Sequence, residues 1–146
     1  MPAAGRRDPY KSYSFLVEID GIASAAFKSV SGLAAEAEVI EYREGSDVLS
    51  SSRKLPGRVR YPNVTLRRGL TTSRDLWDWW QTVVDGGVER RNVVVILLDD
   101  SRTPVLRWLL RNAWIARIEA SELDASKNEI AIETVELAHE GLELES

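Results

Sequence analysis

The chain has 146 residues, 44% of them hydrophobic and 29% charged, and a formal net charge of −4. This length and composition indicate one domain over residues 1–146 and exclude a disordered chain. Because the chain has no cysteine and a single histidine, disulfide frameworks, thiolate or multi-histidine metal sites and cysteine nucleophiles are excluded. Net acidity argues against a general nucleic-acid binder.

The sequence predicts seven strands and one helix. Residues 1–12 are polar and are expected to form an N-terminal arm. Apolar–polar alternation, or a short apolar run between turn residues, predicts the strands, and Asn112-Ala113 marks a bend or bulge in one of them. Their expected ranges are 13–19, 25–30, 35–42, 63–68, 92–98, 105–118 and 129–139. A single helix among so many strands favours a β-sandwich or barrel.

The helix is predicted over residues 74–85. At about 100° per residue, its apolar side chains, Trp79 among them, fall on one side. Thr72 or Ser73 can cap its start, where Thr72 and Asp75 approximate a capping box, and Gly86-Gly87 supplies its end. Such an aromatic face is typical of a helix that closes one end of a core.

Residues 44–62 are expected to form a long loop, rich in glycine, serine and proline. A loop of this length in a compact domain is usually functional or disordered. With Tyr61 as a stacking partner, its cations leave open an oligonucleotide-binding barrel. A solvated loop or a contact with another protein is the alternative, and net acidity favours it. The cations are Arg53, Lys54, Arg58 and Arg60.

The last expected strand, residues 129–139, changes phase. Ile130 and Ile132 are apolar in one phase, and Val135 and Leu137 in the other. A strand that buries one face keeps its phase. We therefore expect either a bulge or a second face that is covered by another surface.

The sequence contains no catalytic constellation. Asp99-Asp100 follows an apolar strand and is a candidate cation site, but a hairpin turn is the more ordinary interpretation. His139 beside a serine or threonine would imitate a hydrolase pair, yet there is no Gly-x-Ser-x-Gly elbow. Gly-rich phosphate loops are absent too. We predict no catalytic, metal or cofactor site, and surplus apolar strand surface suggests a protein that binds its own copies or a partner.

Short segments that run in order through nearly the whole chain carry a family resemblance. They are residues 8–10 (DPY), 15–21 (FLVEIDG), 30–33 (VSGL), 41–45 (EYREG), 54–57 (KLPG), 66–69 (LRRG), 76–79 (LWDW), 90–93 (RRNV), 112–114 (NAW) and 133–141 (ETVELAHEG). The ordered set resembles the tail tube, or inner tube, proteins of contractile phage tails and of extracellular contractile injection systems. The least matched parts are residues 46–53 and 119–127.

The resemblance implies a β-sandwich or barrel subunit that forms six-membered rings, with the strands of neighbours joined into one lumen barrel. Stacked rings make a rigid tube inside a contractile sheath, and contraction drives the tube through a target envelope. The implied partners are other copies of the chain, the sheath protein, the baseplate hub or tube initiator, the terminator, and a cargo of effector protein or DNA. The family has no active site.

Within that assembly the loop over residues 44–62 is predicted to contact an adjacent subunit or ring. The predicted interface residues are Tyr10, Arg53, Lys54, Leu55, Arg58, Val135 and Leu137. Glu36 and Glu38 are predicted to line the lumen, because they alternate with small and apolar residues, so that one face of their strand is wet while the other packs inward.

The short single-domain length and the match to the injection-type pattern favour an injection system over a phage tail. The start of the chain lacks a secretory signal, and the longest aliphatic run, residues 93–98, is too short to span a bilayer. We expect synthesis and assembly in the cytoplasm, as part of a phage-tail-like particle that is released or acts outside the cell.

Overall fold

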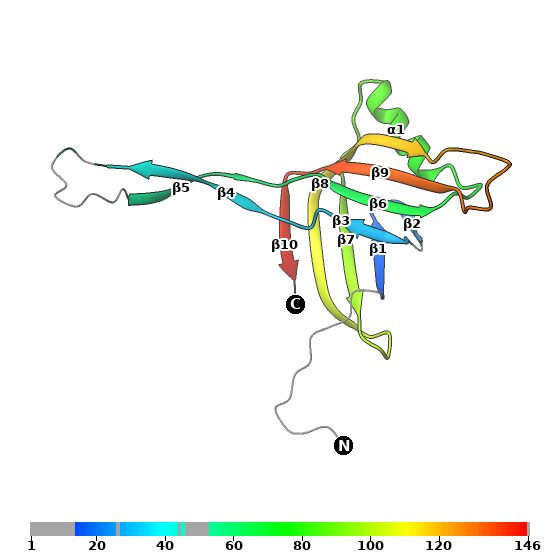
Figure 1. The fold of residues 1–146 in the computed structure, drawn as a ribbon, viewed down its shortest axis with the longest axis horizontal. Coiled ribbons are helices and arrows are strands. Elements are labelled where there is room, and N and C mark those ends of the chain that lie inside the picture. Colours follow the sequence, from blue (N-terminus) through cyan, green and yellow to red (C-terminus); the bar gives the residue numbers. More distant parts are fainter. Residues whose placement is uncertain (1–13, 26, 44, 46–52, 146) are drawn as a thin grey trace, which may run out of the picture.

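The computed structural model describes residues 14–25, 27–43, 45 and 53–145. Within them the chain forms ten strands and one helix (Figure 1). The fold is mainly β with a single helix, as predicted, with more strands than the seven expected. The elements are β1 (Phe15–Ile19), β2 (Ile22–Ala25), β3 (Ser29–Ser31), β4 (Glu36–Tyr42), β5 (Arg53–Arg60), β6 (Val64–Gly69), α1 (Asp75–Val84), β7 (Arg91–Leu98), β8 (Pro104–Ala120), β9 (Ile132–Ala138) and β10 (Gly141–Glu145).

Eight strands form one antiparallel sheet around the 17-residue strand β8. The sheet runs β2-β1-β7-β8-β9-β6-β3, and β10 also pairs with β8. The first half of β8 pairs with β7 and β10, and its second half pairs with β9. We call β2-β1-β7-β8-β10 the first layer and β8-β9-β6-β3 the second layer. Between the two halves Asn112 has a φ of 52°, in the left-handed region, which confirms the bend predicted at Asn112-Ala113.

The core lies between the inner faces of the two layers. Val17 and Val93 of the first layer and Leu66 and Val135 of the second layer are buried in one hydrophobic cluster. Because side chains alternate between the faces of a strand, every second residue of these strands points into the cluster. The apolar alternation that predicted the strands is therefore explained by this core.

Helix α1 covers one end of the core (Figure 1). Its Leu76 and Trp79 are buried in the same cluster. Trp79 Nε1 donates a hydrogen bond of 2.7 Å to the backbone carbonyl of Glu89, which satisfies the only polar atom of the buried ring. No helix within the described residues is long and apolar enough to cross a membrane.

The predicted capping box of α1 is wrong. The N-cap position is Arg74, without a side-chain capping bond, and Asp75 instead accepts a 2.7 Å hydrogen bond from the backbone N–H of Leu76. Thr72 lies two residues before the N-cap position, too far to cap the helix, while Ser73 Oγ accepts a 3.4 Å hydrogen bond from the Asp75 N–H. The predicted end is confirmed, because Gly86 adopts a φ of 84° directly after the C-cap residue.

Strands β4 and β5 form a separate two-stranded sheet, which we call the β4–β5 hairpin. It projects from the body of the molecule (left in Figure 1). The expectation of a loop over residues 44–62 is therefore wrong for its second half; residues 44 and 46–52 lie outside the described residues. The sequence did not predict β5 because this strand contains Pro56 and Gly57, two residue types that are uncommon in strands. A two-stranded sheet consists of edge strands only, where proline is tolerated.

The other strand boundaries differ in three places. The strand expected over residues 25–30 is divided between β2 and β3, and β10 was not predicted. β9 begins only at Ile132, so Ile130 precedes it; Ile132 lies on the face opposite to the buried Val135 and Leu137, and burial alternates without a break along β9. The irregularity lies in the partner strand instead, between Ile115 and Arg117 of β8.

Candidate subunit interface

The β4–β5 hairpin exposes the cations that were predicted to contact a neighbour. Arg53, Lys54 and Arg58 lie on β5, where every residue except Gly57 is exposed. In the part of the chain that the structure describes, none of these three cations has an ion-pair partner. Their charge is therefore available to a binding partner.

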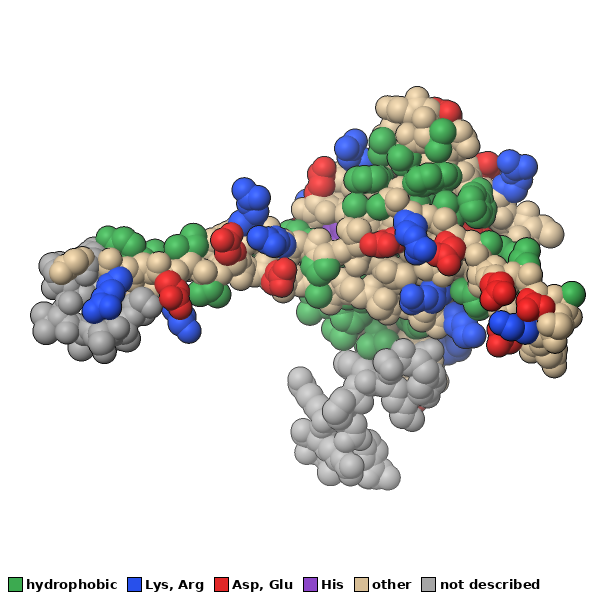
Figure 2. All heavy atoms as spheres, turned by 45° about the horizontal axis from the view of Figure 1, so that its top comes forward, with side chains coloured by type: hydrophobic (Ala, Val, Ile, Leu, Met, Phe, Trp, Pro, Cys, Tyr) green, Lys and Arg blue, Asp and Glu red, His purple; other side chains and the backbone are tan. Residues whose placement is uncertain are grey.

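Apolar side chains are exposed on both faces of the same hairpin. Ile40 and Leu55 lie opposite each other in the strand register, and each is 46% exposed. Val39 and Val59 lie on the other face and are more exposed still, at 63% and 54%. Figure 2 shows hydrophobic and charged side chains interleaved along this arm. Exposed apolar surface bordered by charge is typical of a protein–protein contact site.

Two of the predicted interface residues are placed elsewhere. Val135 and Leu137 are 1% and 0% exposed and belong to the chain's own core. The prediction that they contact a neighbouring subunit is wrong, because the opposite layer of the same chain already covers them. Tyr10 lies outside the described residues.

Glu36 and Glu38 lie on β4, at the base of the hairpin and not in the eight-stranded sheet. All seven residues of β4 are exposed. The expectation that one face of this strand packs inward is therefore wrong within the single chain. The role of the two glutamates in the lumen stays a prediction.

The outer face of the first layer carries charge that the sequence analysis did not single out. The register places Glu18, Leu109 and Glu143 in one row across this layer, on the face opposite the core. Arg107 and Arg111 flank that row on β8, and Arg111 pairs with Glu143 at 2.7 Å. This hydrogen bond raises the pKa of the Arg111 guanidinium. The period-two alternation of the sequence already places these charged residues on one face of each strand. Which of them lie side by side became clear only from the strand pairing.

A buried ionic cluster joins the second layer to helix α1. Arg68 Nη2 lies 2.6 Å from Asp75 Oδ1 and 3.3 Å from Glu133 Oε1, and the guanidinium carbon lies 5.7 Å from the centre of the Phe27 ring. Partial burial acts to raise the pKa of Asp75. Hydrogen bonds from Arg68 and from the Leu76 N–H outweigh it, so that the pKa is lowered. Because each charge has a partner inside the fold, this cluster is structural.

Asp99 and His139, which the sequence offered as candidates for a cation site and a hydrolase pair, both make local hydrogen bonds to the backbone. Asp99 Oδ1 accepts bonds of 2.9 Å from the N–H groups of Ser101 and Thr103, which makes Asp99-Asp100 a hairpin turn. The ring nitrogens of His139 lie 3.0 and 3.1 Å from the backbone carbonyls of Gly141 and Pro62. No group of three or more acidic or histidine side chains that could hold a metal occurs among the described residues.

With the fold and its exposed surfaces in view, the family can be assigned. The family model described as T4-like virus tail tube protein gp19 matches residues 11–143. The chain belongs to this family. The resemblance found in the sequence is confirmed, and the chain is a tail tube protein. No curated protein sequence matches it significantly.

Solved structures of contractile injection systems contain similar chains. A chain of the PVC sheath/tube terminator in the extended state is 29% identical, with a TM-score of 0.86 over 96% of this chain and 99% of that one. A chain of the PVC sheath–tube complex is also 29% identical, with a TM-score of 0.84 over 94% and 92%. A chain of the anti-feeding prophage baseplate, symmetrised six-fold, has the same identity and a TM-score of 0.83 over 95% and 97%.

More distant structures share the fold alone. Hcp1 from Flavobacterium johnsoniae is 14% identical, with a TM-score of 0.59 over 89% of this chain and 93% of that one. At such low identity the similarity concerns the arrangement of strands and the helix. It supports the mainly β fold with a single helix.

Proposed function

We propose that this tail tube protein forms hexameric rings that stack into the inner tube of a contractile injection system. The observation that carries the proposal is the similarity over more than nine-tenths of the chain to subunits of the PVC and anti-feeding prophage assemblies. The second candidate is the tail tube of a contractile phage that conducts DNA, and the description of the matching family favours it.

Ring closure is proposed to use the two edges of the first layer. β2 pairs only with β1, and β10 pairs only with β8, within the described residues. Each edge therefore presents unpaired backbone N–H and C=O groups, which act as a template for another strand. Joining β10 of one subunit to β2 of the next satisfies these groups and produces a continuous lumen barrel.

Contacts beyond the lumen barrel are proposed to involve the β4–β5 hairpin. Arg53, Lys54, Leu55 and Arg58 are exposed on it, and we assign them to an adjacent subunit or ring. Charge pairs of this kind determine register and specificity more than bulk affinity. Tyr10, in the arm over residues 1–12, is assigned to the same set of contacts on the basis of the sequence alone.

For the lumen we retain Glu36 and Glu38 and add a second candidate surface, the outer face of the first layer. If the first layer forms the barrel wall, this face lines the bore. It carries both signs of charge, Glu18, Glu143 and Glu145 against Arg107 and Arg111. A mixed, mainly acidic bore would repel anionic cargo only at short range, because salt screens charges over about 10 Å at 0.1 M.

The proposed partners outside the tube are the sheath protein, the baseplate hub or tube initiator and the terminator, with an effector protein or DNA as cargo. The proposal has no enzymatic step. Assembly is placed in the cytoplasm, in a particle that acts outside the cell. The similarity to chains of sheath–tube, baseplate and terminator structures supports these partners.

Electron microscopy and analytical ultracentrifugation of the full chain, with and without a tube initiator, test the proposal. We expect rings with six-fold symmetry and short tubes. A monodisperse monomer at high concentration under both conditions would overturn it, and salt-dependent binding of single strands by that monomer would favour the oligonucleotide-binding alternative. Genes for a sheath, baseplate and AAA+ ATPase without capsid genes nearby would identify an injection system.

A further inference from the structure

We propose that the loop between β8 and β9 is the site that receives the β4–β5 hairpin of another copy of this chain. We call residues 121–131 the β8–β9 loop. This inference rests on the proposed function, since it names the surface that an inter-subunit hairpin would bind. The hairpin and this loop lie at opposite ends of the molecule (left and right in Figure 1).

The β8–β9 loop surrounds a hollow of about 720 Å³, lined by residues 121–132 except Ser126 and Asn128. Leu123 and Ile130 border it and are 72% and 76% exposed, more than any other large apolar side chain of the described residues. Two exposed apolar side chains that border one hollow are typical of an interaction site. A partner that covers both side chains removes that apolar surface from water.

The loop is held in shape by its own hydrogen bonds. Its ends are joined by a pair of bonds between Ser121 and Ile132: the Ser121 N–H donates to the Ile132 carbonyl at 2.7 Å, and the Ile132 N–H donates to Ser121 Oγ at 2.8 Å. Asp124 accepts a 2.9 Å bond from the Ser126 N–H, which closes an internal turn. Such a preorganised surface loses little conformational entropy when a partner binds.

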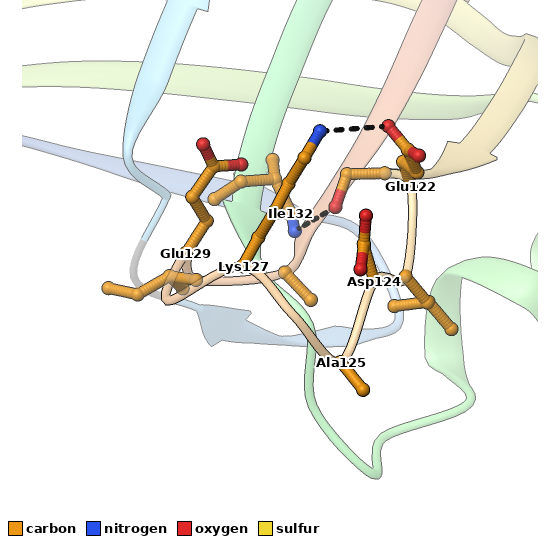
Figure 3. A pocket seen from close by; sticks show the side chains of 10 residues that line it. Glu122, Asp124, Ala125, Lys127, Glu129 and Ile132 are labelled. Carbon is orange, nitrogen blue, oxygen red and sulfur yellow. Dashed lines mark hydrogen bonds and ion pairs between the residues drawn. The ribbon is translucent and has the colours of Figure 1, made fainter.

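The hollow is acidic. Lys127 points across it to Glu122, 3.5 Å away, as Figure 3 shows, while Asp124 and Glu129 also line it. Three carboxylates against one ammonium leave an excess of negative charge. Hydrogen bonds from Ser126 lower the pKa of Asp124, so its carboxylate stays charged well into the acidic range.

Strand β5 of the β4–β5 hairpin matches this surface in charge and in apolar character. It carries four cations, Arg53, Lys54, Arg58 and Arg60, and no carboxylate, and the exposed Leu55 and Val59 lie between them. Over residues 36–60 as a whole the sequence has five cations and five carboxylates, so the basic surface is that of β5. A basic, apolar strand and an acidic, apolar hollow are complementary in the sense that favours a specific interface.

A second hollow is a poorer match for the hairpin. It measures about 410 Å³ and is lined by apolar residues that include Val30, Leu33 and Trp108. Lys28 is its only charged lining residue and would repel the cations of the hairpin. Electrostatics therefore favours the β8–β9 loop.

The positions of the β4–β5 hairpin and the β8–β9 loop also determine the type of assembly that their contact produces. Because one end of a subunit binds the opposite end of the next, the contact is heterologous and leaves a free hairpin and a free loop after every addition. Such a contact propagates, as the growth of a tube requires. A self-complementary contact would stop at a dimer.

Charge reversal provides the test. Variant one carries Arg53→Glu and Lys54→Glu, and variant two carries Glu122→Lys and Glu129→Lys. Each is expected to lose pelletable tubes while its circular dichroism stays that of the wild type. Co-expressed, the two variants are expected to grow again as alternating copolymers, since the acidic hairpin of one meets the basic loop of the other. Arg74→Glu, with a side chain 83% exposed away from both surfaces, is the matched control and keeps its tubes.

A disulfide experiment in the cysteine-free chain separates the two hollows. Leu55→Cys combined with Ala125→Cys is expected to give a ladder of linked subunits when assembled tubes are oxidised. Leu55→Cys combined with Leu33→Cys is expected to give none. Normal tubes from variant two, no growth of the mixture, or a ladder only with Leu33→Cys would overturn the inference. A wild-type chain that never forms rings or tubes contradicts the proposed function itself, so the two failures are distinguishable.

Discussion

Arg68 on β6 and Glu133 on β9 are directly opposite each other in the strand register and form an ion pair inside the core, 3.3 Å from Nη2 to Oε1. Their residues are 3% and 1% exposed. Both lie at the end of the inner face of the second layer, where Asp75 of α1 is a second carboxylate partner of the Arg68 guanidinium. The pair fixes the start of the helix against the sheet.

Removal of one member of this pair is expected to destabilise the fold strongly. Glu133→Ala leaves a buried guanidinium with one partner fewer, and we expect the free energy of unfolding to fall by about 3 kcal/mol or more. Glu136→Ala, on the other face of β9, is the control and is expected to cost less than about 1 kcal/mol. Replacement of the pair with Arg68→Met and Glu133→Leu is expected to restore most of the stability. Equal losses for Glu133→Ala and Glu136→Ala, measured by urea denaturation, would contradict the role of the pair.

Asp75 is expected to make the stability of the fold sensitive to acid. Its pKa is lower in the folded chain than in the unfolded chain, so its contribution is present above the ordinary value of about 3.9 and is lost as the pH falls through the lowered value. Asp75→Asn removes this part of the acid dependence. A direct titration of the Asp75 carboxyl by NMR checks the sign, and an inflection at or above the ordinary value speaks against it.

Gly32 is expected to tolerate no side chain. Its φ is 92°, and a Cβ atom there would lie 2.3 Å from the backbone oxygen of Asn63. Gly32→Ala therefore requires backbone movement between β3 and β6, with an expected cost of about 2 kcal/mol or more. Gly87→Ala is the matched control, because a Cβ atom there meets nothing within 4 Å. Similar melting temperatures for both variants would count against the close approach.

Trp79 and Trp77 lie two positions apart on α1 and are expected to respond very differently to truncation. Trp79 is 1% exposed and fills the end of the core, so Trp79→Ala is expected to lower the free energy of unfolding by about 3–5 kcal/mol. Trp77 is 37% exposed, and Trp77→Ala is expected to cost less than about 1 kcal/mol. Thermal unfolding followed by circular dichroism measures both. Equal costs would mean that the helix packs through another face.

Cysteine labelling of assembled tubes tests the predicted lumen residues. Single cysteines at positions 36 and 38 are expected to react with a small maleimide and not with one too large to enter the bore. The same result is expected for Glu18→Cys and Leu109→Cys on the outer face of the first layer. Fast labelling by the large reagent places a residue on the outside of the tube, and failure to react with either reagent places it in a subunit contact.

The sequence by itself determined the fold class, the helix and, through its ordered segments, the tail tube family. These properties depend on local periodicity and on short motifs, which are visible without knowledge of the strand neighbours. The hydrophobic face with Trp79 is an example, because the 3.6-residue period alone places it on one side of the helix.

Only the tertiary structure decided which apolar side chains remain exposed and so are available to a partner. Val135 and Leu137 have the same pattern as an interface strand, but the opposite layer of the chain buries them. Ile40 and Leu55, with no layer above them, stay exposed on the hairpin. The physical reason is that burial depends on which element packs against a face of the strand. The sequence of a strand specifies which face is apolar, but it does not specify whether another layer of the same chain or a neighbouring subunit packs on that face. The same holds for charge: Arg68 and Glu133 are two of many charged residues in the sequence, and only the register of β6 and β9 brings them together inside the core.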